Sequence, residues 1–264
     1  MQPVLQILLA GGIMLAIAVV FGIILVICSN VFAVRRDERI DRVESLLAKS
    51  NCGGCGKAGC SQFAEALVKG EVKLSDCRAT PAANKQKIAE ILGGGDIGEE
   101  TVAVVHCNGG DACYNKYDYQ GYGDCASCEM LAGGVKACPV GCIGKKTCVN
   151  VCPYGAVSVG DEGYSVVDKE KCVSCGVCIQ NCPKNLISRI PKSAKVYVAC
   201  SNHGKGKDVM ELCKHGCIGC GICEKTCPVG AIAMKDGLPE IDYSKCVGCL
   251  KCVEKCPRKC IKEH

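Results

Sequence analysis

Eight cysteines near the carboxyl end of the chain stand at a spacing that could hold iron–sulfur clusters. They form two runs of the pattern Cys-x2-Cys-x2-Cys-x3-Cys-Pro, from Cys217 to Cys227 and from Cys246 to Cys256. In paired runs of this kind, the first three thiolates of a run bind one [4Fe–4S] cluster and the fourth binds the other cluster. The spacing therefore predicts one cluster on Cys217, Cys220, Cys223 and Cys256, and a second on Cys246, Cys249, Cys252 and Cys227.

The 28 cysteines in 264 residues also raise two alternatives, a disulfide framework and a set of structural zinc sites. Zinc sites usually have two close cysteines and a second pair a dozen or more residues away. Four cysteines within one short run, ended by proline and then repeated, suit a four-iron cluster instead. A disulfide framework would imply export, and the amino-terminal segment described below argues against export.

A second, less regular pair of runs lies upstream. Its later run, Cys172-x2-Cys175-x2-Cys178-x3-Cys182-Pro183, is regular, whereas its earlier run reads Cys138-x3-Cys142-x5-Cys148-x3-Cys152-Pro153. We interpret the wider gaps of the earlier run as insertions. The same crossover rule then assigns Cys138, Cys142, Cys148 and Cys182 to one cluster, and Cys172, Cys175, Cys178 and Cys152 to another.

Short apolar segments follow the Cys-Pro pairs and predict strands over 156–159 and 231–234, with turns at 161–163 and 236–237. This pattern predicts two tandem ferredoxin-like α+β modules, over 133–192 and 193–264. The chain has three Phe and no Trp, so we expect the clusters to replace much of a conventional hydrophobic core.

The amino-terminal segment predicts a membrane anchor over residues 1–34. It contains no Asp, Glu, Lys or Arg, and about 4–32 is long enough to cross a bilayer once as a helix. A signal peptide would have a basic start and a shorter apolar core. Arg35, Arg36 and Arg39 follow the segment, so the charge bias predicts that the remaining domains lie on the cytoplasmic side of the inner membrane. The cytoplasm is reducing, which suits thiolate-bound clusters. Cys28 and Ser29 lie near the inner end of the predicted helix. The helix has no ionisable group of the kind that relays protons, so this chain alone is not expected to conduct ions.

A different cysteine set, Cys52-x2-Cys55-x4-Cys60-x16-Cys77, lies in the predicted domain 35–95. Apolar residues recur with helical period over 40–47 and 63–68, which predicts a small, mainly helical domain with the cysteines on a loop and between helices. Gly53, Gly54 and Gly56 would let backbone amides approach the sulfurs, which favours a [4Fe–4S] cluster. A structural zinc ion is the competing interpretation for these four cysteines.

The whole combination resembles the B subunit of the Rnf complex. The resemblance rests on the uncharged amino-terminal helix with its Arg-rich exit, on residues 51–56 with Cys60 and Cys77, and on cluster motifs that begin at Ala137-Cys138-Pro139. It implies a membrane complex that moves electrons between reduced ferredoxin and NAD and couples this transfer to Na⁺ or H⁺ translocation. The B subunit would be its cluster-bearing electron conduit, with flavin-bearing and NAD-binding subunits, soluble ferredoxin and membrane lipid as partners. The second module resembles the extended form found in anaerobic bacteria.

Eight further cysteines fall outside these sets. Cys107, Cys113, Cys125 and Cys128 lie in a connecting region, 96–132, among several tyrosines, and could hold an extra cluster or metal. Scattered cysteines are more often buried and behave as small apolar residues. We take this as the default interpretation for these four cysteines and for Cys200, Cys213 and Cys260. The eighth cysteine, Cys28, lies in the anchor. The predicted load is therefore five [4Fe–4S] clusters.

Other functional signals are weak. Gly93-x-Gly95-x-x-Gly98 matches a dinucleotide fingerprint, but it follows a helix and precedes the expected strand 102–105, which is the reverse of the required order. The net charge of +5 forms no dense basic stripe, so nucleic-acid binding is not expected. No catalytic residue is predicted. The alternative function is a membrane-tethered polyferredoxin that serves another oxidoreductase without ion coupling.

Overall fold

The computed structural model describes residues 2–31 and 37–264, and it divides into two compact units, Met1–Ile40 and Asp41–His264. Arg35 and Arg36, on which the predicted orientation partly depends, lie outside the described residues. Arg39 is described, and its side chain pairs with Asp37 at 2.6 Å.

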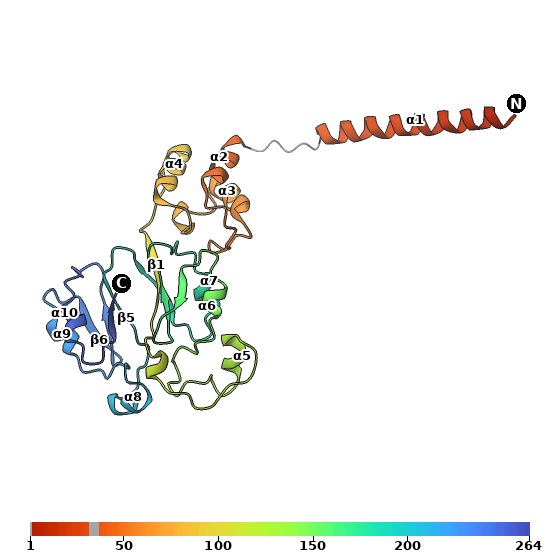
Figure 1. The fold of residues 1–264 in the computed structure, drawn as a ribbon. Helices are drawn as coiled ribbons and strands as arrows, with labels where there is room; N and C mark the ends of the chain where they lie inside the picture. The colour runs from red at the N-terminus through yellow and green to blue at the C-terminus, as the bar shows by residue number, and fades with distance from the viewer. Residues whose placement is uncertain (1, 32–36) are drawn as a thin grey trace. The chain divides into compact units, whose positions relative to one another are not determined.

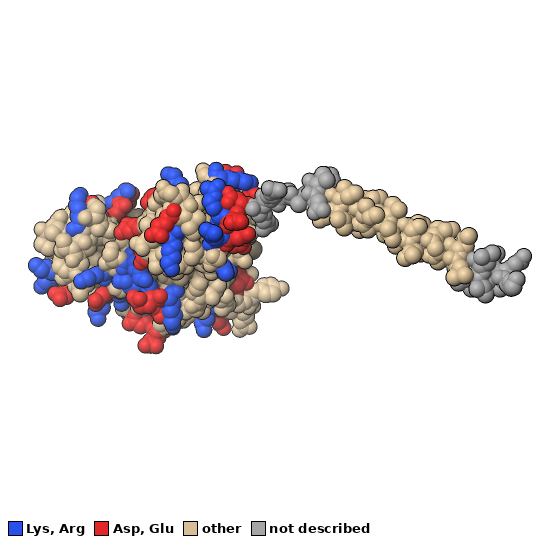
Figure 2. Space-filling model, turned by 90° about the horizontal axis from the view of Figure 1, so that it is seen from above, with Lys and Arg blue, Asp and Glu red and all other residues tan. Residues whose placement is uncertain are grey.

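The first unit consists mainly of one long apolar helix, α1 (Gln2–Val31) (Figure 1). Its segment Gly11–Ser29 is long and apolar enough to cross a membrane, by length and composition. Large apolar side chains such as Leu15, Phe21 and Leu25 are exposed along it, and the visible face of the helix carries no charged side chain among its described residues (Figure 2). Such a continuous apolar surface suits lipid rather than water.

The second unit begins with a small helical domain. It contains α2 (Glu38–Leu46), α3 (Cys60–Val68), a short 3₁₀ turn η1 (Leu74–Asp76) and α4 (Ala82–Leu92). One apolar face of each helix is buried, and the innermost side chains include Val43, Phe63 and Ile88. The Asn84 amide donates to the Leu46 carbonyl at 2.9 Å, which ties α4 to the end of α2. The predicted mainly helical character of this domain is confirmed.

The first ferredoxin-like module contains two antiparallel strand pairs and two short helices. Strand β1 (Thr101–Val105) pairs with β4 (Ile187–Pro191), and β2 (Val157–Val159) pairs with β3 (Ser165–Val167). The helices are α6 (Thr147–Asn150) and α7 (Val177–Gln180). Strand β1 belongs to the segment predicted to be a connecting region, so this region supplies half of one strand pair of the module.

The second module repeats this arrangement. Strand β5 (Val196–Val198) pairs with β8 (Ile261–Glu263), β6 (Ile232–Lys235) pairs with β7 (Leu238–Ile241), and α9 (Ile222–Thr226) and α10 (Lys251–Lys255) are its helices. Asp236 and Gly237 connect β6 to β7 with positive φ values of 48° and 82°. Two such residues form the turn that best matches strand twist, and the predicted turn at 236–237 is confirmed.

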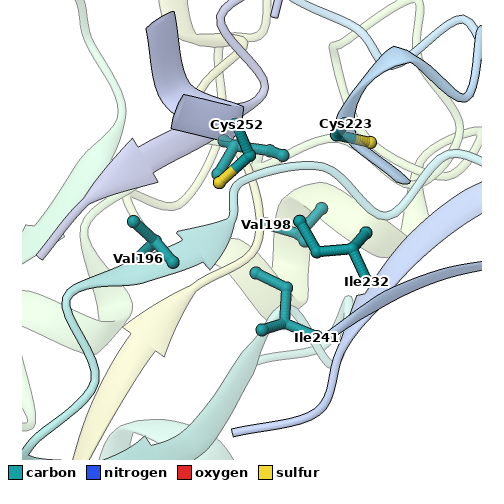
Figure 3. Close-up of a cluster of buried hydrophobic side chains, with 7 residues drawn as sticks. Val196, Val198, Cys223, Ile232, Ile241 and Cys252 are labelled. Atoms are coloured by element: carbon teal, nitrogen blue, oxygen red, sulfur yellow. The ribbon is translucent and has the colours of Figure 1, made fainter. Parts of the chain in front are cut away.

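Cysteines form part of the buried core of each module. In the second module, Cys223 of α9 and Cys252 of α10 pack with apolar side chains of the strands (Figure 3). In the first module, Cys178 of α7 is buried with Leu186 and Ile187. Three further elements, η2 (Gly110–Ala112), α5 (Cys125–Met130) and α8 (Gly206–Leu212), lie in the long connections of the two modules.

Candidate iron–sulfur centres

The regular runs of the second module bring four cysteines to one cavity. Cys217, Cys220, Cys223 and Cys256 line it together with Met234 and Pro239. Gly219 and Gly221 have φ values of 66° and 67°, so glycine permits the tight loop that turns Cys220 and Cys223 to the same side. The Cys260 amide donates to the Cys256 sulfur at 3.3 Å. These are the four cysteines that the crossover rule assigns to one cluster.

The other set of the second module surrounds the start of α10. Cys252 is buried and packs with Cys227 and Cys246 in one apolar cluster. Burial raises the pKa of the Cys252 thiol, and the neighbouring Cys246 and Cys249 thiols raise it further. The Ala231 amide donates to the Cys227 sulfur at 3.3 Å. Thiolates crowded in this way need a cationic centre among them, which the iron atoms of a cluster would supply.

The regular run of the first module has the same environment. Burial raises the pKa of Cys178 to about 12, and the thiols of Cys172, Cys175, Cys148 and Cys152 add to the shift. The Ala156 amide donates to the Cys152 sulfur at 3.4 Å, which matches the contact of Cys227 in the second module. Cys152 therefore lies beside the run to which the crossover rule assigns it.

The remaining predicted set is divided between two cavities. Cys142, Cys148 and Cys182 line a cavity with Cys125, the first residue of α5, and Cys138 is not among the residues that line it. Cys125 is buried, and its amide donates to the Thr147 hydroxyl at 2.8 Å, which fixes the start of α5 beside α6. Burial raises the pKa of Cys142 to about 12, with the neighbouring thiols of Cys107, Cys148 and Cys125 contributing.

The spacing of the first module gives a reason for this placement. Cys142-x5-Cys148-x3-Cys152 has the same spacing as Cys217-x5-Cys223-x3-Cys227, so the earlier run contains no insertion. It lacks its second cysteine instead, because Lys145 stands where Cys220 stands in the other module. Cys125, from outside the run, lines the same cavity as Cys142, Cys148 and Cys182. The sequence indicates Cys125 only as an extra, and the signal that could have identified it is this comparison of the two runs.

The small helical domain brings its own four cysteines together. Cys52, Cys55, Cys60 and Cys77 line one cavity, and Cys175 of the first module forms part of the same wall. The Asn51 side chain accepts from the Cys60 amide at 2.8 Å and so fixes the start of α3, while Cys77 follows η1. A Cβ atom at Gly54 would stand 2.2 Å from the Cys175 carbonyl oxygen, so this glycine permits direct contact between the two loops.

The remaining cysteines have different positions. Cys107, Cys113, Cys138 and Cys213 line a further cavity, with Cys142 and Cys200 on its wall. Cys128 is completely buried in a cluster with Cys125, and Tyr117 and Tyr119 pack against that cluster. Cys260 is buried beside the Cys217 set. Cys28 is exposed on α1.

The sets that contain Cys52, Cys142 and Cys217 each line a cavity. Across residues 2–31 and 37–264, no group of three or more Cys, His, Asp or Glu side chains has the geometry to hold a metal ion. A single zinc ion requires sulfurs at about 2.3 Å from its centre, whereas a four-iron cluster holds its ligands farther apart. Four cysteines that line one cavity are the donor set that a [4Fe–4S] cluster requires.

Comparison with known families agrees with this geometry. Residues 47–79 match a family described as "Putative Fe-S cluster", residues 141–186 and 216–260 match a family described as "4Fe-4S dicluster domain", and residues 171–231 match another of that description. The match over 216–260 contains the eight cysteines of the two regular runs. The match over 141–186 contains seven cysteines.

Fold and site together define an iron–sulfur electron-transfer protein with one candidate membrane helix. Similar proteins include the B subunit of the Na⁺-translocating ferredoxin:NAD⁺ oxidoreductase complex of Acetobacterium woodii, 40% identical over 97% of this chain and 77% of the relative. The B subunit of the ion-translocating oxidoreductase complex of Methanosarcina acetivorans is 42% identical over 91% and 92% of the two chains. The corresponding subunit of the proton-translocating ferredoxin:NAD⁺ oxidoreductase complex of Clostridium ljungdahlii is 39% identical over 99% and 93%.

The chain belongs to the family of B subunits of ion-translocating oxidoreductase (Rnf) complexes. It is an iron–sulfur electron-transfer subunit of such a membrane-associated complex, and it contains 4Fe-4S ferredoxin domains.

Proposed function

We propose that this protein carries electrons between reduced ferredoxin and the flavin-bearing and NAD-binding subunits of its complex, which couples the transfer to Na⁺ or H⁺ translocation. The names of the relatives include ferredoxin:NAD⁺ oxidoreductase together with sodium or proton translocation. The overall reaction takes two electrons from two reduced ferredoxins and passes them, with one proton, to NAD⁺ to form NADH. Each bound [4Fe–4S] cluster would accept and donate one electron at a time.

We propose the following ligand sets for five clusters. They are Cys52, Cys55, Cys60 and Cys77; Cys125, Cys142, Cys148 and Cys182; Cys172, Cys175, Cys178 and Cys152; Cys217, Cys220, Cys223 and Cys256; and Cys246, Cys249, Cys252 and Cys227. Amides of Ala156, Ala231 and Cys260 donate to ligand sulfurs of three sets. Such hydrogen bonds stabilise the reduced, more negative state and thereby raise the reduction potential.

One contact supports the order of the proposed relay. Cys175 belongs to a cluster set of the first module and also forms part of the wall around the Cys52–Cys77 set. The Gly54 backbone rests directly on the Cys175 carbonyl. Because electron transfer weakens steeply with distance, this contact favours electron passage between the first module and the small helical domain. We therefore propose that soluble ferredoxin docks at the second module and that the Cys52 set is the exit to the membrane partners.

The proposal predicts both the iron content and the partners of the protein. Anaerobically prepared protein should contain at least about 20 irons per chain, from five four-iron clusters. The complex should co-purify with flavin-bearing and NAD-binding subunits. An iron content near four per chain would exclude the proposed cluster load. Purification at full iron content with a different oxidoreductase would support the membrane-tethered polyferredoxin instead.

We also propose that the domains after α1 face the cytoplasm. The basic residues Arg35, Arg36 and Arg39 follow the apolar segment, and no basic residue precedes it, which is the charge bias of a cytoplasmic carboxyl end. A reporter fused after His264 should be active only in its cytoplasmic form. Activity of a reporter that requires export would reverse the orientation.

A further inference from the structure

We propose that Cys107, Cys113, Cys138 and Cys213 hold a sixth [4Fe–4S] cluster at the junction of the two ferredoxin-like modules. These four cysteines come from both modules and line one cavity. Cys113, Cys138 and Cys213 are 4%, 8% and 7% exposed and form a single buried group with Val140 beside it.

The backbone around the cavity is shaped to leave room among the sulfurs. A Cβ atom at Gly109 would lie 3.3 Å from the Cys213 sulfur, 3.6 Å from the Cys107 sulfur and 3.3 Å from the Cys113 Cβ atom. The φ value of Gly109 is −67°, which any residue adopts, so backbone conformation does not require glycine here. A side chain at this position would instead crowd the three neighbouring cysteines.

Hydrogen bonds to the sulfurs resemble those of the motif cysteines. The Cys142 amide donates to the Cys107 sulfur at 3.3 Å, as the Ala231 amide does to Cys227. The Asn202 side chain is 8% exposed, and its amide nitrogen donates to the Cys138 sulfur at 3.4 Å. A hydrogen bond to a sulfur is stronger when the sulfur carries negative charge, as the sulfurs of cluster ligands do.

A cation also stands at the wall of the cavity. Lys136 lines it, and its ammonium group donates to the Gly110 carbonyl at 2.8 Å and to the Cys113 carbonyl at 3.1 Å. These bonds hold the positive charge near the four sulfurs. A cluster with four thiolate ligands carries net negative charge, which a fixed neighbouring cation stabilises.

The two modules contribute through equivalent turns. Cys138-x2-Gly141-Cys142 in the first module corresponds to Cys213-x2-Gly216-Cys217 in the second. The Gly141 amide donates to the Cys138 carbonyl at 3.1 Å, and the Gly216 amide donates to the Cys213 carbonyl at 3.4 Å. In each turn the first cysteine faces the junction cavity and the second lines the cavity of its own module.

The position of the cavity gives the cluster a role that deepens the proposed relay and rests on it. Cys142 lines both this cavity and that of the first module. On the other side, the Cys200 side chain lies on its wall, and the Cys200 sulfur accepts from the Cys217 amide at 3.3 Å. One electron would pass from the Cys217 set, which is oxidised, through this cluster to the Cys142 set, which is reduced. The junction cluster returns to its starting state.

Iron and zinc analysis of anaerobically purified full-length protein tests the proposal. With six clusters the wild-type chain should contain about 24 irons and no stoichiometric zinc. Cys213→Ala and Cys113→Ala should each contain about 20 irons, and Cys128→Ala, which removes a buried cysteine outside the set, should keep about 24. Circular dichroism would verify that each variant is folded, and two independent ligand variants guard against the misfolding of one.

Several results would overturn the junction cluster. The first is a wild-type content of about 20 irons with no further loss in Cys213→Ala and Cys113→Ala. The second is one zinc ion per wild-type chain that both variants lose. The third is a Cys113–Cys213 disulfide in the anaerobic protein. In each case the five-cluster relay would stand. A wild-type content far below about 20 irons would overturn the relay itself, so the two failures are distinguishable.

Electron transfer gives a second readout. In folded Cys213→Ala protein, a strong small-molecule reductant should still reduce the clusters of the first module. Reduced ferredoxin should reduce them at least tenfold more slowly than in Cys128→Ala. Equal rates in the two variants would contradict a role of the junction cluster between the modules.

Discussion

Lys145 shows how one residue alters the assignment of a whole ligand set. In the second module the equivalent position is Cys220, which lines a cavity with its own run. With lysine at position 145, Cys125 of α5 lines the cavity of the first module, and Cys138 lines the cavity at the junction. Cys125 and Cys142 line the same cavity, although Cys125 lies 17 residues before Cys142 in the chain.

Paired substitutions should reveal which cysteines share a cluster. Cys138→Ala combined with Cys213→Ala should lose about four irons, the same as either single variant, because both residues serve one cluster. Cys125→Ala combined with Cys213→Ala should lose about eight, because two clusters are affected. Iron analysis of the single and paired variants measures these losses. A loss of about eight irons in the Cys138–Cys213 pair, with each single variant losing about four, would place the two cysteines in different clusters.

Gly54 offers a second test at the scale of one residue. Gly54→Val would force side-chain atoms against the Cys175 carbonyl, so the two loops must separate. We expect a loss of roughly 1–3 kcal/mol in unfolding free energy from overpacking, and slower electron transfer from the first module to the Cys52 set. Thermal unfolding and rapid-mixing kinetics measure the two effects. Gly123→Ala, at a glycine with nothing within 4 Å of its Cβ position, is the control, and equal behaviour of both variants would contradict the contact.

At the scale of elements, His106 connects the strand pairs of the two modules. Its ring nitrogen Nδ1 donates to the Val198 carbonyl at 2.6 Å, because a carbonyl can only accept, and Nε2 then accepts from the Ser188 hydroxyl at 2.6 Å. Ser188 belongs to β4 and Val198 to β5. The neutral ring therefore connects one module to the other, and burial lowers the pKa of His106 from its usual 6.5.

This linkage has a defined dependence on pH. The unfolded state binds the proton more tightly than the folded state, so the stability contribution of neutral His106 is fully present above about pH 6.5 and is lost as the pH falls below it. His106→Gln, which does not titrate, should lose less stability between about pH 7.5 and pH 5.5 than the wild type. Anaerobic thermal unfolding at both pH values measures this difference. An identical loss in both proteins would contradict the effect.

The elements also show what the sequence could predict. The strands at 156–159, 231–234 and 102–105 are recognisable because apolar residues stand near Cys-Pro pairs, glycines and turn residues, and the structure has β2, β6 and β1 there. The pairing of β1 with β4 is not predictable from these local signals, because Val105 and its partner Ile187 lie far apart in the chain and no local pattern specifies the pairing. For the same reason the convergence of Cys107, Cys113, Cys138 and Cys213 could only emerge from the fold.

At the scale of the whole molecule, the cysteine sets of the larger unit form a continuous series. Cys142 lines two neighbouring cavities, Cys148 lies near Cys178, and Cys175 lies on the wall of the Cys52 set. Mixed acidic and basic side chains cover the visible face of this unit (Figure 2). Clusters bound at the proposed sets would form a series of neighbouring redox centres, as a protein that relays electrons requires.

Electron flow through a Cys52→Ala complex tests the proposed relay most directly. The variant lacks one ligand of the set that we propose as the exit, while every other set keeps its cysteines. Reduced ferredoxin should still reduce the clusters of both modules, and NADH formation by the assembled complex should fall at least a hundredfold relative to Cys128→Ala. Undiminished NADH formation by Cys52→Ala complex of normal abundance would contradict the relay and make the Cys52 set a structural site.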